Sequence, residues 1–167
     1  MKDHETFLSA AAAVAAARPD VQFVIAGRGT EAAATLHERA RVSGIAARVH
    51  FLGERDDAPR LLAALDVAVS SSYGEAFPNA VGEAMACGTP CVVTDVGDTA
   101  ALVGDTGIVV PPRDPAALAR GIEHVLNLPA TERQALGCAA RRRVADNFSL
   151  ARTTERYERL YLQVAGC

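Results

Sequence analysis

Residues 66–94 read DVAVSSSYGEAFPNAVGEAMACGTPCVVT and combine two short apolar segments with a helical pattern between them. The apolar segments, Asp66–Ser70 and Cys91–Thr94, are short and β-rich, which favours strands. Pro78–Cys87 has a helical pattern and is followed by Gly88, a common helix stop. A strand, a helix and a second strand in this order predict two parallel strands joined by a crossover helix.

The same alternation continues on both sides of this unit. Further strands are predicted at Val21–Ala26, Arg48–Leu52 and Gly107–Val110, and further helices at Glu5–Arg18, Glu31–Ser43, Ala58–Leu65 and Thr99–Leu102. The strands are almost continuously apolar, as expected when helices cover both faces of a parallel sheet. Three more helices, Ala116–Leu126, Thr131–Asp146 and Leu150–Ala165, form a helical tail. We therefore predict an α/β fold with a mostly parallel sheet, helices on both faces and a C-terminal helical tail.

Composition narrows the function classes. The chain has 167 residues, half of them hydrophobic, and a net charge of −3, which suits one domain with a substantial core. There is no basic field for a nucleic acid, and the longest apolar stretch, Ala10–Ala17, is too short to span a membrane. No leader pattern opens the sequence, so we expect a cytoplasmic protein. The four cysteines form no zinc pattern, and no D-x-D pair has ligand spacing, so no metal is predicted.

Glu75 and Glu83 bracket a helix start that begins with Pro78, a residue suited to the first helical position. The backbone N–H groups of residues 79–81 would then point ahead of the helix, an arrangement that favours a phosphate. Two carboxylates near a phosphate site are unusual unless they accept hydrogen bonds from hydroxyls. A sugar nucleotide offers both groups, and the site would lie at the carboxyl end of a strand, where such sheets bind ligands. The alternative is a loop charge and a solvated helix face.

Several segments together resemble the donor half of family 4 retaining glycosyltransferases: Lys2–Leu8, Phe23–Gly27, Val49–Gly53, Glu75–Pro90, Val96–Asp98 and Gly107–Asp114. The resemblance implies a GT-B fold, in which two Rossmann-like domains enclose the reaction, with residues 1–167 as the nucleotide-sugar (donor) domain. It implies transfer of a hexosyl group to an acceptor hydroxyl with retention, in polysaccharide or glycolipid biosynthesis. The donor would be a UDP- or GDP-linked sugar, bound as a substrate, with no cofactor.

The resemblance also assigns roles to individual positions. Glu75 would accept hydrogen bonds from hexose hydroxyls, Glu83 would bind the ribose hydroxyls, and Lys2 would contact the diphosphate. The base would lie against the backbone near Leu52 and Gly53. Lys2 and Glu75 are the catalytic candidates, and the donor-binding candidates are Lys2, Leu52, Gly53, Gly74, Glu75, Phe77, Asn79, Ala80 and Glu83.

Two parts of the family pattern have no counterpart in this sequence. The family's first, central strand and the arginine at its end would precede Lys2, and the N-terminal acceptor domain is also absent. We therefore expect a fragment, or a chain completed by an acceptor domain or a second chain that supplies the missing strand. A gap between Val21–Ala26 and Asp66–Ser70 would leave buried backbone groups unpaired, at about 1–3 kcal/mol each. Alternatively, these two strands would pair directly.

Other functions stay open from the residues alone. Gly27-x-Gly29-x-x-Ala32 follows a strand and formally fits a dinucleotide-binding fingerprint, with Glu54 as the ribose-binding acid. This pattern would suit an NAD-dependent oxidoreductase, whereas the simpler interpretation of the glycines is a tight turn. A catalytically incompetent nucleotide-sugar-binding fragment, and an epimerase or phosphorylase of the same fold, are further alternatives.

Overall fold

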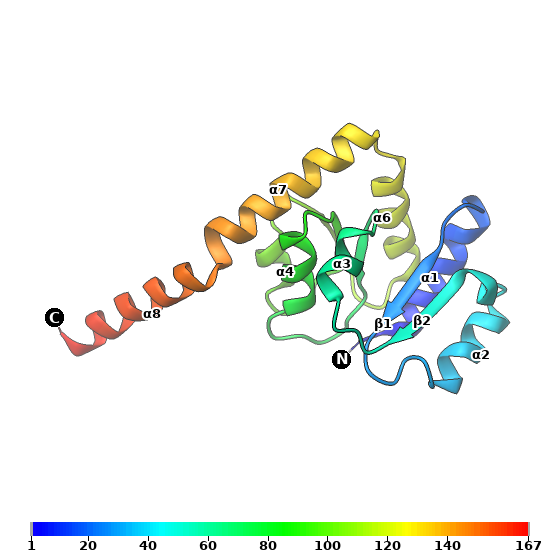
Figure 1. Cartoon of the computed structure of the whole chain (residues 1–167), viewed down its shortest axis with the longest axis horizontal. Coiled ribbons are helices and arrows are strands. Elements are labelled where there is room, and N and C mark those ends of the chain that lie inside the picture. Colours follow the sequence, from blue (N-terminus) through cyan, green and yellow to red (C-terminus); the bar gives the residue numbers. More distant parts are fainter. Residues whose placement is uncertain (1, 167) are drawn as a thin grey trace.

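A computed structural model describes residues 2–166 of the protein (Figure 1). Helices and strands alternate through the first two thirds of the chain, and helices follow. The elements are α1 (His4–Ala17), β1 (Phe23–Ala26), α2 (Ala34–Val42), a short 3-10 turn (Ala46–Arg48), β2 (Val49–Gly53), α3 (Ala58–Ala63), β3 (Ala68–Ser70), α4 (Asn79–Ala86), β4 (Cys91–Thr94), α5 (Thr99–Val103), β5 (Ile108–Val110), α6 (Pro115–Asn127), α7 (Ala130–Phe148) and α8 (Leu150–Ala165). The predicted α/β class with a helical tail is confirmed.

The strands form two parallel sheets instead of one. β1 pairs with β2, while β3, β4 and β5 form a second sheet in that order. Among the described residues, no strand lies between β1 and β3, and these two strands do not pair with each other. The expected gap at the position of the family's central strand is therefore present, and the alternative of direct pairing is wrong.

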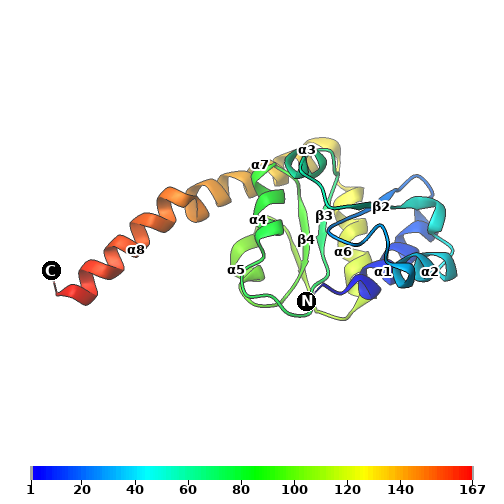
Figure 2. The same ribbon diagram turned by 60° about the horizontal axis from the view of Figure 1, so that its bottom comes forward.

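The core continues through both sheets because the side chains of β4 alternate between two buried clusters. Val92 packs with residues of α1 and α6, whereas Cys91 and Val93 pack with α4, α5 and α7. In Figure 2, α4 and α5 lie on one side of β4 and α6 lies on the other. All four residues of β4 are buried, as expected of a strand covered on both faces.

Two predicted helix starts need correction. Pro78 is the N-cap of α4, and Asn79 is its first helical residue, because the Pro78 carbonyl already accepts the first helical hydrogen bonds. α2 begins at Ala34 instead of Glu31, since the preceding residues form turns, including one in which the Thr30 N–H donates to Gly27 O. The other predicted elements agree with the structure to within two residues at each end.

The last two helices lead away from the body of the protein. α7 packs against α4 along part of its length, and α8 continues outward to the C-terminal end (Figures 1 and 2). None of the residues of α8 is buried. Within residues 2–166, no helix combines the length and apolar character needed to cross a bilayer.

Candidate functional site

The loop that joins β3 to α4 is attached to the neighbouring strand β4. The Thr94 hydroxyl, at the end of β4, donates to Ser72 O at 2.5 Å and is 3.3 Å from Ser70 O. Thr94 and Ser72 are both fully buried. The loop therefore leaves the carboxyl end of the sheet at a fixed point, which is where open parallel sheets bind ligands.

Glu75 receives two hydrogen bonds on one carboxylate oxygen. Its Oε1 accepts from Lys2 Nζ at 2.5 Å and from Ser72 Oγ at 2.8 Å. The hydrogen bond from Lys2, followed by that from Ser72, lowers the pKa of Glu75 against the opposing effect of desolvation. Within residues 2–166, no hydrogen bond to Glu75 Oε2 is found.

Lys2 reaches this loop because the start of α1 is attached to it. Asp3 caps α1 by accepting the Thr6 N–H at 3.0 Å, and its own carbonyl accepts the Ser71 hydroxyl at 2.8 Å. Residues far apart in the sequence, Lys2 and Glu75, are thereby brought into direct contact. Both were predicted as site residues, and their contact was not.

A second loop supports Glu75 from the backbone side. The Asp98 N–H donates to Ala76 O at 3.1 Å, and Gly97 has a φ of +52°. A Cβ atom added at Gly97 would lie 2.2 Å from Glu75 O, so only glycine allows this approach. The glycine in the Val96–Asp98 segment is the signal that could have identified this support, although the sequence did not show what it approaches.

The start of α4 offers fewer free N–H groups than predicted. The Asn79 N–H donates to Phe77 O and the Val81 N–H donates to Pro78 O, which corrects the expectation that all three point ahead of the helix. Of the three, only the N–H of Ala80 has no backbone acceptor in residues 2–166. The reason is the N-cap position of Pro78, whose carbonyl closes the first turn. The helix dipole still favours an anion at this end.

Glu83 and Phe77 lie at the margins of this site. Glu83 is exposed on α4, one turn after Asn79, and forms no ion pair with the described residues. The Phe77 ring is 41% exposed and lies 6.0 Å from the Phe148 ring of α7. A role for Glu83 in ribose binding stays a prediction.

One aromatic contact next to the site was missed from the sequence. The Arg113 guanidinium lies 4.5 Å from the centre of the Tyr73 ring. In the sequence, Tyr73 directly precedes Gly74 and Glu75. Arg113 has a φ of +59°, the one positive value among the described non-glycine residues. This left-handed conformation costs a non-glycine residue about 1–2 kcal/mol. No motif in the sequence pairs a residue after β5 with one after β3.

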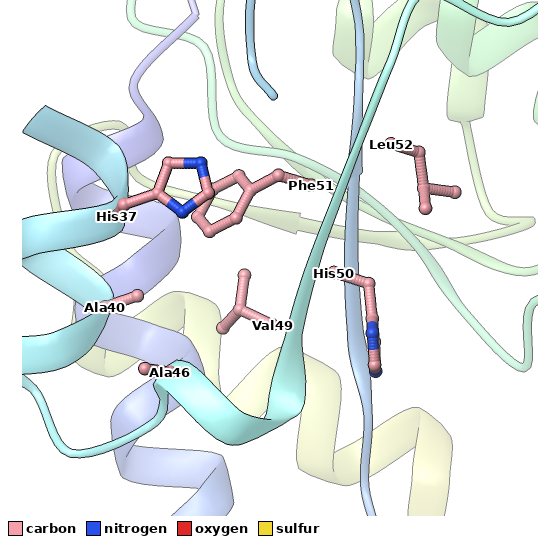
Figure 3. Close-up of a pocket in the computed structure, with 7 residues that line it drawn as sticks. All are labelled: His37, Ala40, Ala46, Val49, His50, Phe51 and Leu52. Atoms are coloured by element: carbon pink, nitrogen blue, oxygen red, sulfur yellow. The ribbon is translucent and has the colours of Figure 1, made fainter. Parts of the chain in front are cut away.

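Leu52 and Gly53 end β2, in the other sheet, and among residues 2–166 they form no hydrogen bond with Lys2 or Glu75. In Figure 3, Phe51 points toward His37, whereas Leu52 lies on the other side of the strand. Gly53 O accepts the Gly27 N–H at 2.7 Å, and the Glu31 carboxylate lies over Gly53. The expected base position therefore belongs to a different sheet from the strand that leads to Glu75, and its role in binding the base stays a prediction.

The loop after β1 does not have the geometry of a dinucleotide-binding turn. α2 starts at Ala34, two residues past the fingerprint, so the helix does not open on Gly27 and Gly29 as that motif requires. Glu54, the candidate ribose acid, forms a bidentate ion pair with Arg28 at 3.0 Å. The glycines serve a turn here. In residues 2–166, no three His, Cys, Asp or Glu side chains are grouped so that they could hold a metal ion.

Comparison with known proteins identifies the family. The family described as glycosyl transferases group 1 matches residues 1–128. The chain belongs to this family. D-inositol 3-phosphate glycosyltransferase of Corynebacterium diphtheriae is 36% identical to this group 1 chain over an alignment of 180 residues, gaps included. The alignment covers 99% of this chain and 42% of the relative.

Solved glycosyltransferase structures share the fold. A glycosyltransferase from Rickettsia africae ESF-5 has a TM-score of 0.89 at 22% identity, over 98% of this group 1 chain and 45% of that protein. Anabaena HepE in complex with UDP and glucose has a TM-score of 0.79 at 27% identity, over 93% of this chain and 44% of HepE. These findings confirm the predicted GT-B resemblance. The chain spans less than half the length of each of these proteins.

Proposed function

We propose that the chain is the donor-binding half of a retaining glycosyltransferase and holds a nucleoside-diphosphate sugar at the carboxyl end of β3. The observation that carries this proposal is the Lys2–Glu75–Ser72 cluster beside the start of α4. In this cluster Lys2 would serve as the cation for a diphosphate, and the neighbouring Glu75 carboxylate would accept from sugar hydroxyls. Anabaena HepE, which was solved with UDP and glucose, supports a UDP-linked sugar.

In the proposed reaction, positive charge develops on the hexose while negative charge grows on the departing diphosphate. Lys2 and the N-terminal end of α4 would stabilise that diphosphate, and we assign no role to a metal or a cofactor. Glu75 Oε2 would orient the hexose, while Glu83 would hold the ribose. Such preorganised donors each contribute about 3 kcal/mol to a transition state.

The acceptor hydroxyl would bind to an acceptor domain outside this sequence. We infer that the isolated chain binds the donor without transferring the sugar. A retaining outcome, a cytoplasmic location and a place in polysaccharide or glycolipid synthesis stay predictions.

Calorimetric titration with UDP, UDP-glucose, a GDP-sugar and NAD tests the assignment. We expect binding of UDP and UDP-glucose and none of NAD. Glu83→Ala should weaken UDP and UDP-glucose alike by about tenfold, the loss of one charged hydrogen bond. Glu75→Ala should weaken UDP-glucose by about tenfold and leave UDP nearly unchanged. Equal losses of both ligands in Glu75→Ala would contradict a contact with the hexose.

A further inference from the structure

The arginines in the loops at the carboxyl ends of the strands differ in what holds them. Arg28, after β1, and Arg55, after β2, each donate two hydrogen bonds to one carboxylate. Arg113, after β5, is exposed and lies over the Tyr73 ring instead. No carboxylate within residues 2–166 forms an ion pair with it. Its charge is therefore held in place without an anionic partner in the described part of the chain.

The backbone of Arg113 is fixed from both sides. Pro111 and Pro112 precede it, and the proline ring restricts φ to about −65°. Asp114 follows it and caps α6 by accepting the Ala117 N–H at 2.8 Å. Between these residues Arg113 has a φ of +59°. Glycine adopts this conformation without strain, so a turn at this point does not account for an arginine.

The side chain of Arg113 is suited to an anion. Its guanidinium lies 4.5 Å from the centre of the Tyr73 ring, well within the range of a cation–π attraction. A guanidinium carries N–H donors in a planar fork that matches two oxygens of one carboxylate or phosphate. No oxygen atom within residues 2–166 accepts a hydrogen bond from these donors. The ring therefore orients a fork whose hydrogen bonds are still to be made.

This cation lies beside the loop that carries Glu75. Tyr73 is two residues from Glu75, so their Cα atoms are at most about 7 Å apart. The Asp98 N–H donates to a carbonyl of that loop, and the Asp95 N–H donates to Val110 O at the end of β5. The loop after β4 thus joins the loop of Glu75 to the strand that leads to the cation. Cation and carboxylate border the same edge of the sheet.

We propose that Arg113 binds an anionic group, a phosphate or a carboxylate, on a sugar held beside Glu75. The proposal rests on the proposed function, from which it takes the sugar and its place beside Glu75. Lys2, the cation proposed for the diphosphate, already contacts Glu75, so Arg113 supplies a separate positive charge. Two sugars can carry the anionic group, the transferred hexose and the acceptor, and the experiment separates them.

Calorimetric titration of the whole chain with two pairs of probes tests this assignment. An anion on the transferred hexose predicts that UDP-glucuronate binds about tenfold or more tightly than UDP-glucose. An anion on the acceptor predicts that glucose 6-phosphate binds about tenfold or more tightly than glucose. A preference for the charged probe in one pair supports the proposal and names the source. Equal binding within both pairs would overturn it.

Matched variants assign the preference to one side chain. Arg113→Ala and Arg113→Gly should both reduce the preference for the charged probe about tenfold. Arg120→Ala should keep it, because Arg120 is an equally exposed arginine on α6 without an ion pair to the described residues. The glycine variant should melt about 2 °C higher than the alanine variant, since only glycine relieves the positive φ. A preference retained in both Arg113 variants, or lost only in the less stable one, would overturn the proposal.

Failure of this proposal is distinguishable from failure of the proposed function. If neither UDP nor UDP-glucose binds the unaltered chain, the proposed function fails, and glucose 6-phosphate with its glucose control still tests Arg113 without a nucleotide. If UDP-glucose binds and the Arg113 variants keep every preference, the proposed function stands and the anion site is wrong.

Discussion

The loops after β1 and β3 both leave the carboxyl end of a parallel strand, yet they differ in what holds them. After β3, Glu75 contacts Lys2 from the start of α1 and Ser72 from its own loop, and Gly97 packs beneath it. After β1, the charged residues Arg28 and Glu54 pair with each other, and their side chains are 85% and 63% exposed. Carboxylates and glycines occur in both loops. Attachment to distant segments, and not residue content, distinguishes the candidate site.

The largest contrast is expected between two glycines. Gly97→Ala should lower the free energy of unfolding by about 3 kcal/mol, since a Cβ would strike the Glu75 carbonyl and the residue has a positive φ. Gly29→Ala, also at a positive φ but with nothing within 4 Å, should cost only about 1 kcal/mol. Urea unfolding of both variants measures the difference. Equal losses would show that the Gly97 approach does not support the loop.

The two loop cations should differ in ligand binding. Lys2→Ala should weaken UDP by about tenfold or more, because hydrogen bonds to charged groups contribute about 1.5–3 kcal/mol. Arg28→Ala removes only an exposed ion pair and should leave UDP affinity nearly unchanged. Calorimetric titration of both variants with UDP gives the comparison, and a similar loss in Arg28→Ala would place the diphosphate at the β1 loop.

Substitutions at two buried threonines should distinguish an effect on folding stability from an effect on ligand binding. Thr94→Val and Thr30→Val each remove a hydroxyl that donates to a loop carbonyl, Ser72 O and Gly27 O respectively. Each should destabilise the chain by about 1 kcal/mol. Only Thr94→Val should also weaken UDP-glucose, by a few-fold, because Thr94 anchors the loop that carries Glu75. If both variants bound UDP-glucose as tightly as the unaltered chain, the anchor would have no part in ligand binding.

The smallest effect concerns pH. The folded state lowers the pKa of Glu75 below its ordinary value of 4.5, mainly through the hydrogen bond from Lys2. A lowered carboxyl pKa stabilises the folded state above the unfolded pKa, and this contribution is lost as the pH falls through the folded pKa. Melting curves between pH 7 and 3 should therefore show a smaller fall in melting temperature on acidification for Glu75→Gln than for the unaltered chain. Glu54→Gln, at the exposed pair, should follow the unaltered curve more closely.

Much of the architecture could be predicted because it depends on local patterns. Cys91–Thr94 and Leu150–Ala165 have the predicted ends, since a run of β-branched residues and a helical repeat are read from neighbours in sequence. The predicted start of α2 was wrong because the turn at Gly27–Thr30 depends on hydrogen bonds that the hydrophobic pattern of the sequence does not show. The N-cap position of Pro78 differs from the predicted first helical position by one residue, which is within the usual uncertainty of helix ends.

By itself, the sequence determined the alternation of strands and helices and the family, and it predicted Glu75 as a site residue, because each depends on residue identity and spacing along the chain. Only the tertiary structure decided that Lys2 and Ser72 share one oxygen of Glu75, that Gly97 lies against the Glu75 carbonyl and that Leu52 belongs to a different sheet from β3. These relations join segments separated by many residues, so they are fixed by how the helices and sheets pack. The gap between β1 and β3 joins both sources: the sequence predicts it, and the pairing of the strands into two separate sheets shows it.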